Sequence, residues 1–181
     1  MQGWSLTDPK IRIILINRKG VWCALLKVAG VKIQIGNGHM EAYALLRTLW
    51  REETDRPFPQ IAYTERGKPY FPEEKLHFSV THTKNYAFCV LSDRPVGIDA
   101  EELGRKINPA LAEKILSPGE LRQYEAAADK NRALLTFWVL KEAEAKCTGE
   151  GIRIHPNHTD FSLNDPRVQE NMDCLVAIIE E

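Results

Sequence analysis

Short stretches in which apolar and polar residues alternate predict strands along much of the chain. In residues 96–101, with the sequence VGIDAE, apolar side chains alternate with a glycine and two carboxylates, the period at which residues i and i+2 share one face of a strand. The pattern predicts a half-buried strand on which Asp99 and Glu101 point the same way. Further strands are expected at residues 11–17, 21–28, 61–64, 76–80, 86–91, 159–163 and 172–180. Residues 18–20, Arg-Lys-Gly, predict a hairpin turn between the first two of these.

Three segments carry the signals of helices. Residues 40–53 place large apolar side chains on one stripe and are followed by the helix-ending pair Arg56-Pro57. Residues 117–120, Ser-Pro-Gly-Glu, form a capping box with proline at the first helical position, which predicts a helix from there to about Ala128. A long helix is expected after Asp129, because the chain from 134 to 146 contains neither glycine nor proline. The layout is mixed α and β.

Glu142 lies in the middle of an apolar stripe on that long helix. The stripe is formed, at 100° per residue, by Leu134, Leu135, Trp138, Val139 and Ala145. A carboxylate in such a position loses water, and an ionised group does so only when it is paired or bound to a metal. Lys146 follows one turn later on the same face. The alternative is an ordinary surface pair of Glu142 and Lys146, which would stabilise the helix by only ~0.2–0.5 kcal/mol.

Three carboxylates and a lysine that converge would suit a phosphate handled through a divalent cation. The Cα atoms of Asp99 and Glu101 would lie roughly 6.5 Å apart at ~3.3 Å per residue, so both side chains could reach one hard cation. Taken alone, this Asp-x-Glu pair could be a solvated strand end. Glu142 in its apolar stripe favours the metal interpretation.

Composition sets limits on the class of protein. The chain has 181 residues, of which 44% are hydrophobic and 27% charged, enough for one compact unit or two small lobes. A net charge of −1 argues against a general nucleic-acid binder, which would carry a basic excess.

The cysteines and the apolar runs indicate a cytoplasmic protein without a membrane partner. The four cysteines lack metal-type spacing, and Cys23, Cys89 and Cys174 stand in apolar runs typical of reduced core residues. The first residues lack a signal-peptide core, and the apolar run 13–16 is too short to span a membrane.

Four motifs follow one another along the chain and together resemble a known family. They are Gly-Lys-Pro at 67–69, LHFSVTHT at 76–83, VGIDAE at 96–101 and FWVLKEAEAK at 137–146. In order and approximate spacing, across residues 67–151, they look like the 4′-phosphopantetheinyl transferase superfamily, of the Sfp type.

The resemblance implies an α+β fold of two similar lobes related by a pseudo-two-fold axis. The N-terminal lobe would comprise residues 1–94 and the C-terminal lobe residues 95–181, with the active site in the cleft between them. Such a pseudo-dimer is expected to be a monomer.

The resemblance also implies a reaction. The family transfers 4′-phosphopantetheine from coenzyme A to a serine of an acyl or peptidyl carrier protein, with Mg²⁺, and releases adenosine 3′,5′-bisphosphate. Such carriers serve fatty acid, polyketide or nonribosomal peptide biosynthesis. Two other classes remain open: a metal-dependent nucleotide pyrophosphatase or phosphodiesterase, and a non-catalytic relative that binds carrier proteins.

For the metal, the resemblance assigns Asp99, Glu101 and Glu142 as ligands. Glu142 is also the expected base for the carrier serine, directly or through a metal-bound water. These expectations agree with the shared strand face and with the carboxylate in the apolar stripe.

For the coenzyme, the resemblance assigns Lys146 to the pyrophosphate, His82 to the phosphates and Lys68 to the nucleotide end. Thr81 stands where the family usually has serine and keeps a hydroxyl donor. Ahead of the first long helix, where the family usually holds the 3′-phosphate with basic residues, only His39 is available. Coenzyme A and its 3′-dephospho form are therefore expected to bind with similar affinity.

Overall fold

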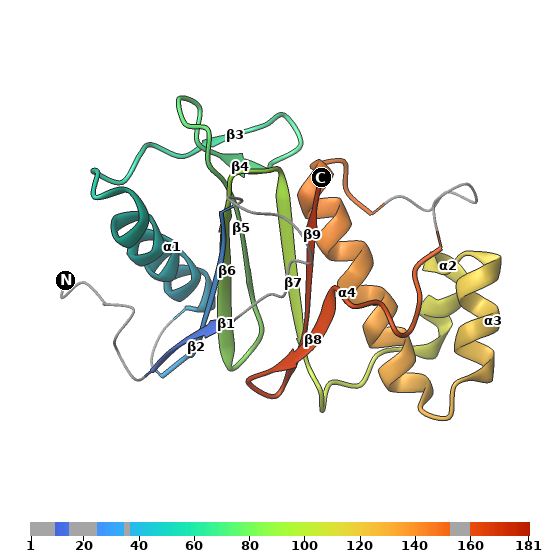
Figure 1. Ribbon diagram of the computed structural model, residues 1–181. Helices are drawn as coiled ribbons and strands as arrows, with labels where there is room; N and C mark the ends of the chain where they lie inside the picture. Colours follow the sequence, from blue (N-terminus) through green and yellow to red (C-terminus); the bar gives the residue numbers. More distant parts are fainter. Residues whose placement is uncertain (1–9, 15–24, 35–36, 153–159) are drawn as a thin grey trace.

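The elements of the protein stack as four layers in the order helix, sheet, sheet, helix (Figure 1). The computed structural model describes residues 10–14, 25–34, 37–152 and 160–181. In this part of the chain, α1 (Gly38–Thr54) forms one outer layer and α4 (Lys130–Thr148) the other. The expected mixture of helices and strands is confirmed.

Two antiparallel sheets form the inner layers. The first sheet has the order β1-β2-β6-β5 and the second the order β7-β9-β8. Their strands are β1 (Ile11–Ile14), β2 (Leu26–Lys32), β5 (His77–His82), β6 (Tyr86–Ser92), β7 (Val96–Glu102), β8 (Val168–Asn171) and β9 (Cys174–Glu180). The short strands β3 (Ala62–Tyr63) and β4 (Pro69–Tyr70) form a separate hairpin. Both sheets thus lie between the two long helices.

Helix α1 covers the outer face of the first sheet. The predicted stripe, Leu45, Leu46, Leu49 and Trp50, is fully buried there. The helix starts where the side chain of Asn37 accepts a hydrogen bond from the backbone N–H of His39, an ordinary N-cap. His39 is thereby held in the first turn of α1.

The alternating pattern of β7 divides its side chains between two layers. Val96, Ile98 and Ala100 point between the sheets, where they pack with Phe88 and Val90 of β6. The residues between them face α4. The predicted strand and its two faces are confirmed.

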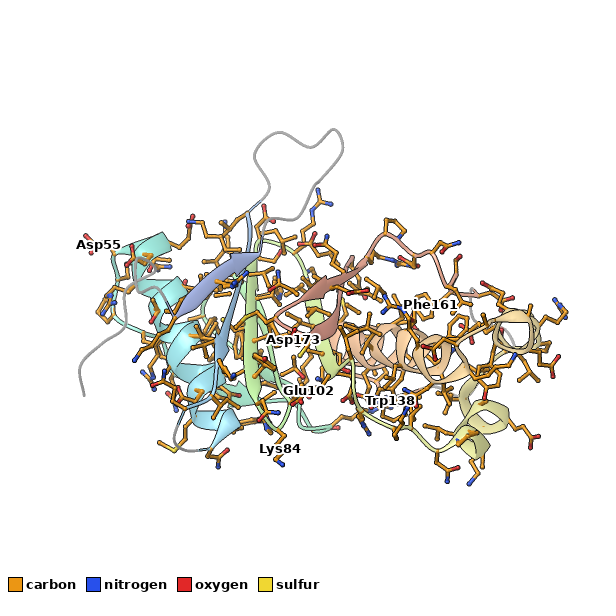
Figure 2. The ribbon with its side chains drawn as sticks, turned by 90° about the horizontal axis from the view of Figure 1, so that it is seen from below. Asp55, Lys84, Glu102, Trp138, Phe161 and Asp173 are labelled. Carbon is orange, nitrogen blue, oxygen red and sulfur yellow. The ribbon has the colours of Figure 1, made fainter. Side chains whose placement is uncertain are left out.

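The turn between β8 and β9 helps to join the sheets. Met172 and Asp173 both have positive φ, as expected for a two-residue hairpin turn of type I′. The carboxylate of Asp173, labelled near the centre of Figure 2, accepts a hydrogen bond of 2.9 Å from the hydroxyl of Tyr86 in the first sheet.

Helix α4 is covered on nearly all sides. Its buried residues include Phe137 and Leu140 on the side opposite the predicted stripe. The smaller elements at this end of the molecule are η1 (Pro109–Leu111), α2 (Ala112–Ile115) and α3 (Pro118–Ala126).

A buried ion pair joins α3 to α4. The capping box at Ser117 is present, and its Glu120 is completely buried. Lys141 reaches the Glu120 carboxylate at 2.8 Å, and the backbone N–H of Phe161 donates to the same carboxylate at 3.1 Å. Lys141, the residue before Glu142, therefore has a structural partner away from the predicted site.

The strand expected at residues 159–163 is wrong for its described part, since residues 160–163 form a loop. The backbone N–H groups of Phe161 and Leu163 donate to side chains of α3, namely to Glu120 and Gln123. These two donors are therefore not available for a strand ladder, and the strand that pairs with β9 is β8 instead. The apolar alternation of Phe161 and Leu163 reflects packing beneath α3 and α4.

Some expectations fall partly outside the described residues. β1 and β2 pair antiparallel with Ile11 opposite Val31, but the predicted turn at 18–20 lies outside them, as does Cys23. Cys89, Cys147 and Cys174 are buried free thiols. No helix in the described ranges is both long and apolar enough to cross a membrane.

Gly97 lets β7 pass directly against α4. A Cβ atom at this position would overlap the carbonyl oxygen of Ala143 and the backbone nitrogen of Cys147. The contacts of Gly97 on this face are therefore made with backbone atoms of the helix.

We expect Gly97→Ala to destabilise the protein by about 1–3 kcal/mol, the usual cost of overpacking a core. A backbone carbonyl has no rotamer by which to escape the added methyl group. Chemical unfolding monitored by circular dichroism measures the loss. Gly104→Ala is the matched control, because no atom of the described residues lies within 4 Å of a Cβ atom there. Equal stability of the two variants would contradict the prediction.

Candidate functional site

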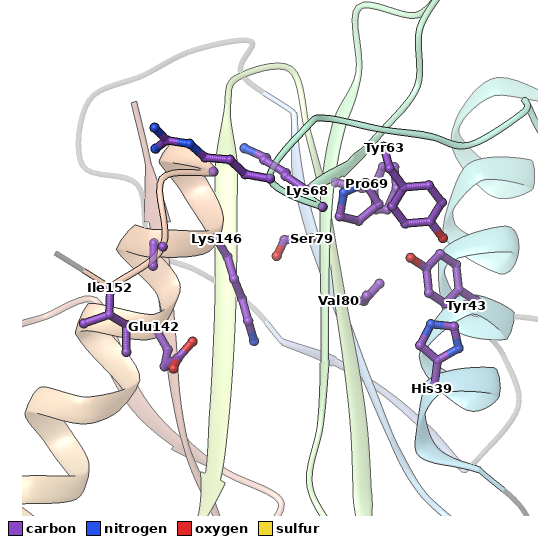
Figure 3. A pocket seen from close by; sticks show the side chains of 16 residues that line it. His39, Tyr43, Tyr63, Lys68, Pro69, Ser79, Val80, Glu142, Lys146 and Ile152 are labelled. Atoms are coloured by element: carbon purple, nitrogen blue, oxygen red, sulfur yellow. The ribbon is translucent and has the colours of Figure 1, made fainter. Parts of the chain in front are cut away.

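Two adjoining cavities lie where β5, β7, α4 and the start of α1 come together. The first, which we name the carboxylate cavity, has a volume of about 430 Å³ and is lined by Asp99, Glu101, Glu142 and Lys146 among others. The second, the hairpin cavity, has a volume of about 470 Å³ and extends to the β3–β4 hairpin. His39, Val80, Glu142 and Lys146 line both cavities. Figure 3 shows Glu142 and Lys146 reaching from α4, with His39 and Tyr43 on the side of α1.

Asp99 is the most enclosed of the three carboxylates. Its Oδ1 atom accepts two hydrogen bonds, one from Lys146 Nζ at 2.7 Å and one from Thr81 Oγ1 at 3.0 Å. Its Oδ2 atom is buried and has no hydrogen-bond partner among the described residues. A buried carboxylate oxygen without a donor costs free energy, so this atom is suited to a cation.

Glu101 is held by two side chains that the sequence did not single out for this role. Trp138 Nε1 donates to Glu101 Oε1 at 3.1 Å, and Arg105 forms an ion pair with the same oxygen. The sequence feature that could have identified Trp138 as a site residue is its position one turn before Glu142 on the same stripe. Arg105 lies in the turn after β7, where sequence spacing does not indicate the direction of a side chain.

Glu142 projects from α4 into both cavities and is half-buried. Burial raises the pKa of its carboxyl group, and the nearby charge of Asp99 raises it further, while Lys146 and Arg105 act in the opposite direction. Lys146 pairs with Asp99 and not with Glu142, so the alternative of an ordinary surface pair is wrong. Glu142 instead shares a site with a like charge.

The carboxylates suit a metal ion, although their present partners are cationic side chains. In the described part of the chain, no group of three or more histidine, cysteine, aspartate or glutamate side chains is arranged to hold a metal ion. Lys146 and Arg105 neutralise Asp99 and Glu101 in this arrangement. The unpartnered Oδ2 of Asp99 fits a hard cation, since carboxylate oxygens are the ligands that Mg²⁺ prefers.

His82 stands at the end of β5 and lines the carboxylate cavity. Its ring packs against the start of α1, where a Cβ atom at Gly38 would come within 2.7 Å of the ring. Its Nδ1 atom lies 3.4 Å from the carbonyl oxygen of Thr83. The exposed side chain is thus held close to the first turn of α1, next to His39.

Lys68 lines the hairpin cavity, but its ammonium group already has a partner. Lys68 Nζ donates to the carbonyl oxygen of Cys147 in the last turn of α4, and its stem lies against Gly149. Burial lowers the pKa of the Lys68 ammonium group. The lysine therefore caps the negative end of α4 from the hairpin of the other half of the chain.

The wall of the hairpin cavity near α1 is aromatic. The rings of His39 and Tyr43 lie 4.6 Å apart between centroids. Burial and the neighbouring Tyr63 raise the pKa of the Tyr43 hydroxyl to about 12. Figure 3 shows the hydroxyl groups of Tyr43 and Tyr63 next to each other on this wall. Arg66 also lines this cavity, beside Lys68, and sequence reasoning missed it.

The structure thus brings every predicted site residue to one of the two cavities. The three carboxylates, Lys146, Thr81 and His82 line the carboxylate cavity, and Lys68 lines the hairpin cavity. Their roles in binding or catalysis remain predictions.

Comparison with known proteins supports the resemblance seen in the motifs. A model of the 4′-phosphopantetheinyl transferase superfamily matches residues 95–173. The 4′-phosphopantetheinyl transferase psf-1 of Bacillus pumilus is 34% identical over 113 residues, which cover 60% of this chain and 48% of that protein. The transferase gsp of Aneurinibacillus migulanus is 32% identical over 95 residues, covering 51% and 39% of the two chains. The transferase HetI of Nostoc sp. is 35% identical over 98 residues, covering 50% and 41%.

These matches confirm the similarity to the superfamily and define its extent. The chain spans less than half the length of these three relatives in the matched segments. The family model includes Asp99, Glu101, Glu142 and Lys146, whereas Lys68, Thr81 and His82 precede its first matched residue.

The raised pKa of Glu142 leads to a stability prediction for the metal-free protein. The folded-state pKa lies above the ordinary 4.5, so the folded protein loses stability when this carboxyl group ionises. At low pH the group is protonated and the loss is absent, and the loss grows as the pH rises through the folded-state pKa. The melting temperature of Glu142→Gln at pH 7 should therefore lie about 1–3 °C above that of the wild type. The gain is modest because solvent screens the half-exposed group. The difference should vanish as the pH falls toward 4.5.

Thermal unfolding in the presence of a chelator measures this difference. Glu144→Gln on the same helix is the matched control, since it removes a carboxylate outside both cavities. A lower melting temperature for Glu142→Gln at pH 7 would show that the carboxylate is stabilised by its surroundings.

Proposed function

We propose that this protein is a Mg²⁺-dependent 4′-phosphopantetheinyl transferase that modifies a serine of an acyl or peptidyl carrier protein with coenzyme A as donor. One observation carries the proposal. The buried Asp99 shares a cavity with Glu101 and Glu142; Lys146 binds one of its oxygens, and the other has no partner within the described ranges. All four residues lie in the segment that matches the superfamily.

The proposed architecture is two lobes, residues 1–94 and 95–181, related by a pseudo-two-fold axis. Its support is that each half of the chain supplies one long helix packed on one antiparallel sheet. The proposed site then lies where the two lobes meet. A monomer would contain the whole site.

Asp99, through its free Oδ2, Glu101 and Glu142 would hold the magnesium ion. A bound Mg²⁺ would offset the negative charge of the pyrophosphate and stabilise the departing bisphosphate. Arg105 and Lys146 occupy carboxylate oxygens in the structure, and both are cations able to turn from a carboxylate to a phosphate. The ion pairs thus keep like charges from repelling one another before the ligands arrive.

Coenzyme A would lie across both cavities. Its pyrophosphate belongs beside Lys146, which lines both of them, with His82 and Arg105 as further donors in the carboxylate cavity. The nucleotide end would occupy the hairpin cavity, which is lined by His39, Arg66 and Lys68.

In the proposed reaction, the serine oxygen of the carrier attacks the phosphorus that bears the pantetheine arm. The bond from that phosphorus to the bridging oxygen breaks, and adenosine 3′,5′-bisphosphate leaves. Glu142 accepts the serine proton, directly or through a water molecule; because a carboxylate bound to Mg²⁺ is a weak base, the route through water is favoured. Lys146 stabilises the charge that develops on the leaving group.

The reaction is tested by incubating the protein with Mg²⁺, coenzyme A and an apo carrier protein. Intact mass spectrometry should show a single phosphopantetheine added to the carrier. Glu142→Gln should reduce transfer by orders of magnitude, because the amide keeps the shape but loses the charge and the proton acceptor, while Glu144→Gln should remain active. Lys146→Ala should slow the chemical step more than it weakens coenzyme binding.

Three outcomes would contradict the proposal. Transfer undiminished by a strong chelator would exclude the metal. Hydrolysis of coenzyme A, with carriers from fatty acid, polyketide and peptide systems unmodified, would identify a pyrophosphatase. Absence of both reactions would identify a binding relative.

The hairpin cavity changes the expectation for the 3′-phosphate. Arg66 joins His39 there, so we expect coenzyme A to bind at least tenfold more tightly than its 3′-dephospho form, a difference of ~1.4 kcal/mol. Arg66→Ala should remove most of this preference. Isothermal titration with both ligands measures it, with Arg122→Ala as the control, since that exposed arginine on α3 lies outside both cavities. An unchanged preference in Arg66→Ala would assign the 3′-phosphate to other residues.

A further inference from the structure

We propose that Thr81 is a positioning residue for the metal ligand Asp99 and not a contact for the coenzyme. The inference rests on the proposed function and assigns Thr81 a role that acts through the carboxylate. Thr81 lies on β5 of the first sheet, and Asp99 lies on β7 of the second. The hydrogen bond between them therefore joins the two halves of the chain at the site.

The bond is buried and short enough to orient the carboxylate. Thr81 Oγ1 lies 3.0 Å from Asp99 Oδ1, with the two residues 7% and 6% exposed. Two residues earlier on β5, the hydroxyl of Ser79 accepts a hydrogen bond of 3.2 Å from the backbone N–H of Ile98. Ser79 and Thr81 share a face of β5, so this strand holds β7 at two successive positions.

The Thr81 hydroxyl is fully used by these partners. It donates its proton to Asp99 and accepts a hydrogen bond of 3.2 Å from Lys146 Nζ. A hydroxyl has a single proton to donate, so none is left for a phosphate oxygen. Thr81 differs in this respect from His82 and Lys146, whose N–H groups can still donate hydrogen bonds to a ligand.

The arrangement leaves one oxygen of Asp99 for a cation. Thr81 and Lys146 both donate to Oδ1, whereas Oδ2 is buried and has no partner in the part of the chain that the structure describes. The carboxylate torsion of an aspartate is broad and two-fold, so the carboxylate would otherwise turn to share both oxygens with the lysine. The hydroxyl, on a β-branched side chain with few rotamers, keeps Oδ2 directed into the carboxylate cavity when Lys146 turns to the pyrophosphate.

The test is a divalent-cation titration without coenzyme or carrier, by calorimetry with Mg²⁺ or Mn²⁺. Thr81→Val keeps the side-chain shape and removes the hydroxyl, and it should weaken cation binding by about 10–100-fold, as loss of a partner to a ligand usually does. Thr81→Ser should restore most of the affinity. Under saturating Mg²⁺, the KM for coenzyme A should change little in Thr81→Val while kcat falls.

Thr136→Val is the matched control. Thr136 is a buried threonine, 6% exposed, whose hydroxyl donates at 3.0 Å to the carbonyl of Arg132 on α4, and it lines neither cavity. Its substitution should leave both cation binding and transfer unchanged. Circular dichroism establishes that each variant is folded; if Thr81→Val does not fold, Thr81→Ala and Thr81→Ser provide the same comparison.

The outcomes separate this proposal from the proposed function. Wild-type cation affinity in Thr81→Val, or a raised KM for coenzyme A with cation binding intact, overturns the positioning role and makes Thr81 a structural residue or a coenzyme contact. Cation binding that depends on Thr81 in a protein that modifies no carrier supports the positioning role and overturns the transferase.

Discussion

The site depends on the direct contact between the backbone of β7 and helix α4. With no side chain at Gly97, the strand lies against the carbonyl oxygen of Ala143, one turn before Lys146 and Cys147. This approach places Asp99, two residues further along the same face, within 2.7 Å of the Lys146 ammonium group. A larger residue at position 97 would force the helix away and lengthen every contact between the carboxylates of β7 and the side chains of α4.

A second set of contacts holds the two halves of the chain in register. Ser79 and Thr81 of β5 bind β7, and Lys68 of the hairpin caps the last turn of α4. Each contact comes from the first half of the chain and ends on an element that carries a proposed ligand or donor. Movement of the hairpin would therefore be transmitted to α4, and movement of β5 to Asp99.

Much of the fold and the membership of the site could be predicted from local pattern. The period of two in residues 96–101 predicted β7 and the shared face of Asp99 and Glu101, and the apolar stripe predicted α4 with Glu142 within it. The prediction of a strand at 159–163 was wrong because alternation indicates only which side chains are buried. It does not indicate which acceptors the backbone N–H groups bind. In this loop, backbone N–H groups donate hydrogen bonds to the side chains of Glu120 and Gln123.

The sequence by itself determined the elements, their buried faces and the residue types available for chemistry, because these follow from spacing along the chain. Only the tertiary structure decided the partners. Lys146 binds Asp99 and not Glu142, Arg105 and Trp138 hold Glu101, and Arg66 joins the hairpin cavity. Such pairings join residues whose separation in sequence carries no information about distance, since they are set by how the two sheets and two helices pack.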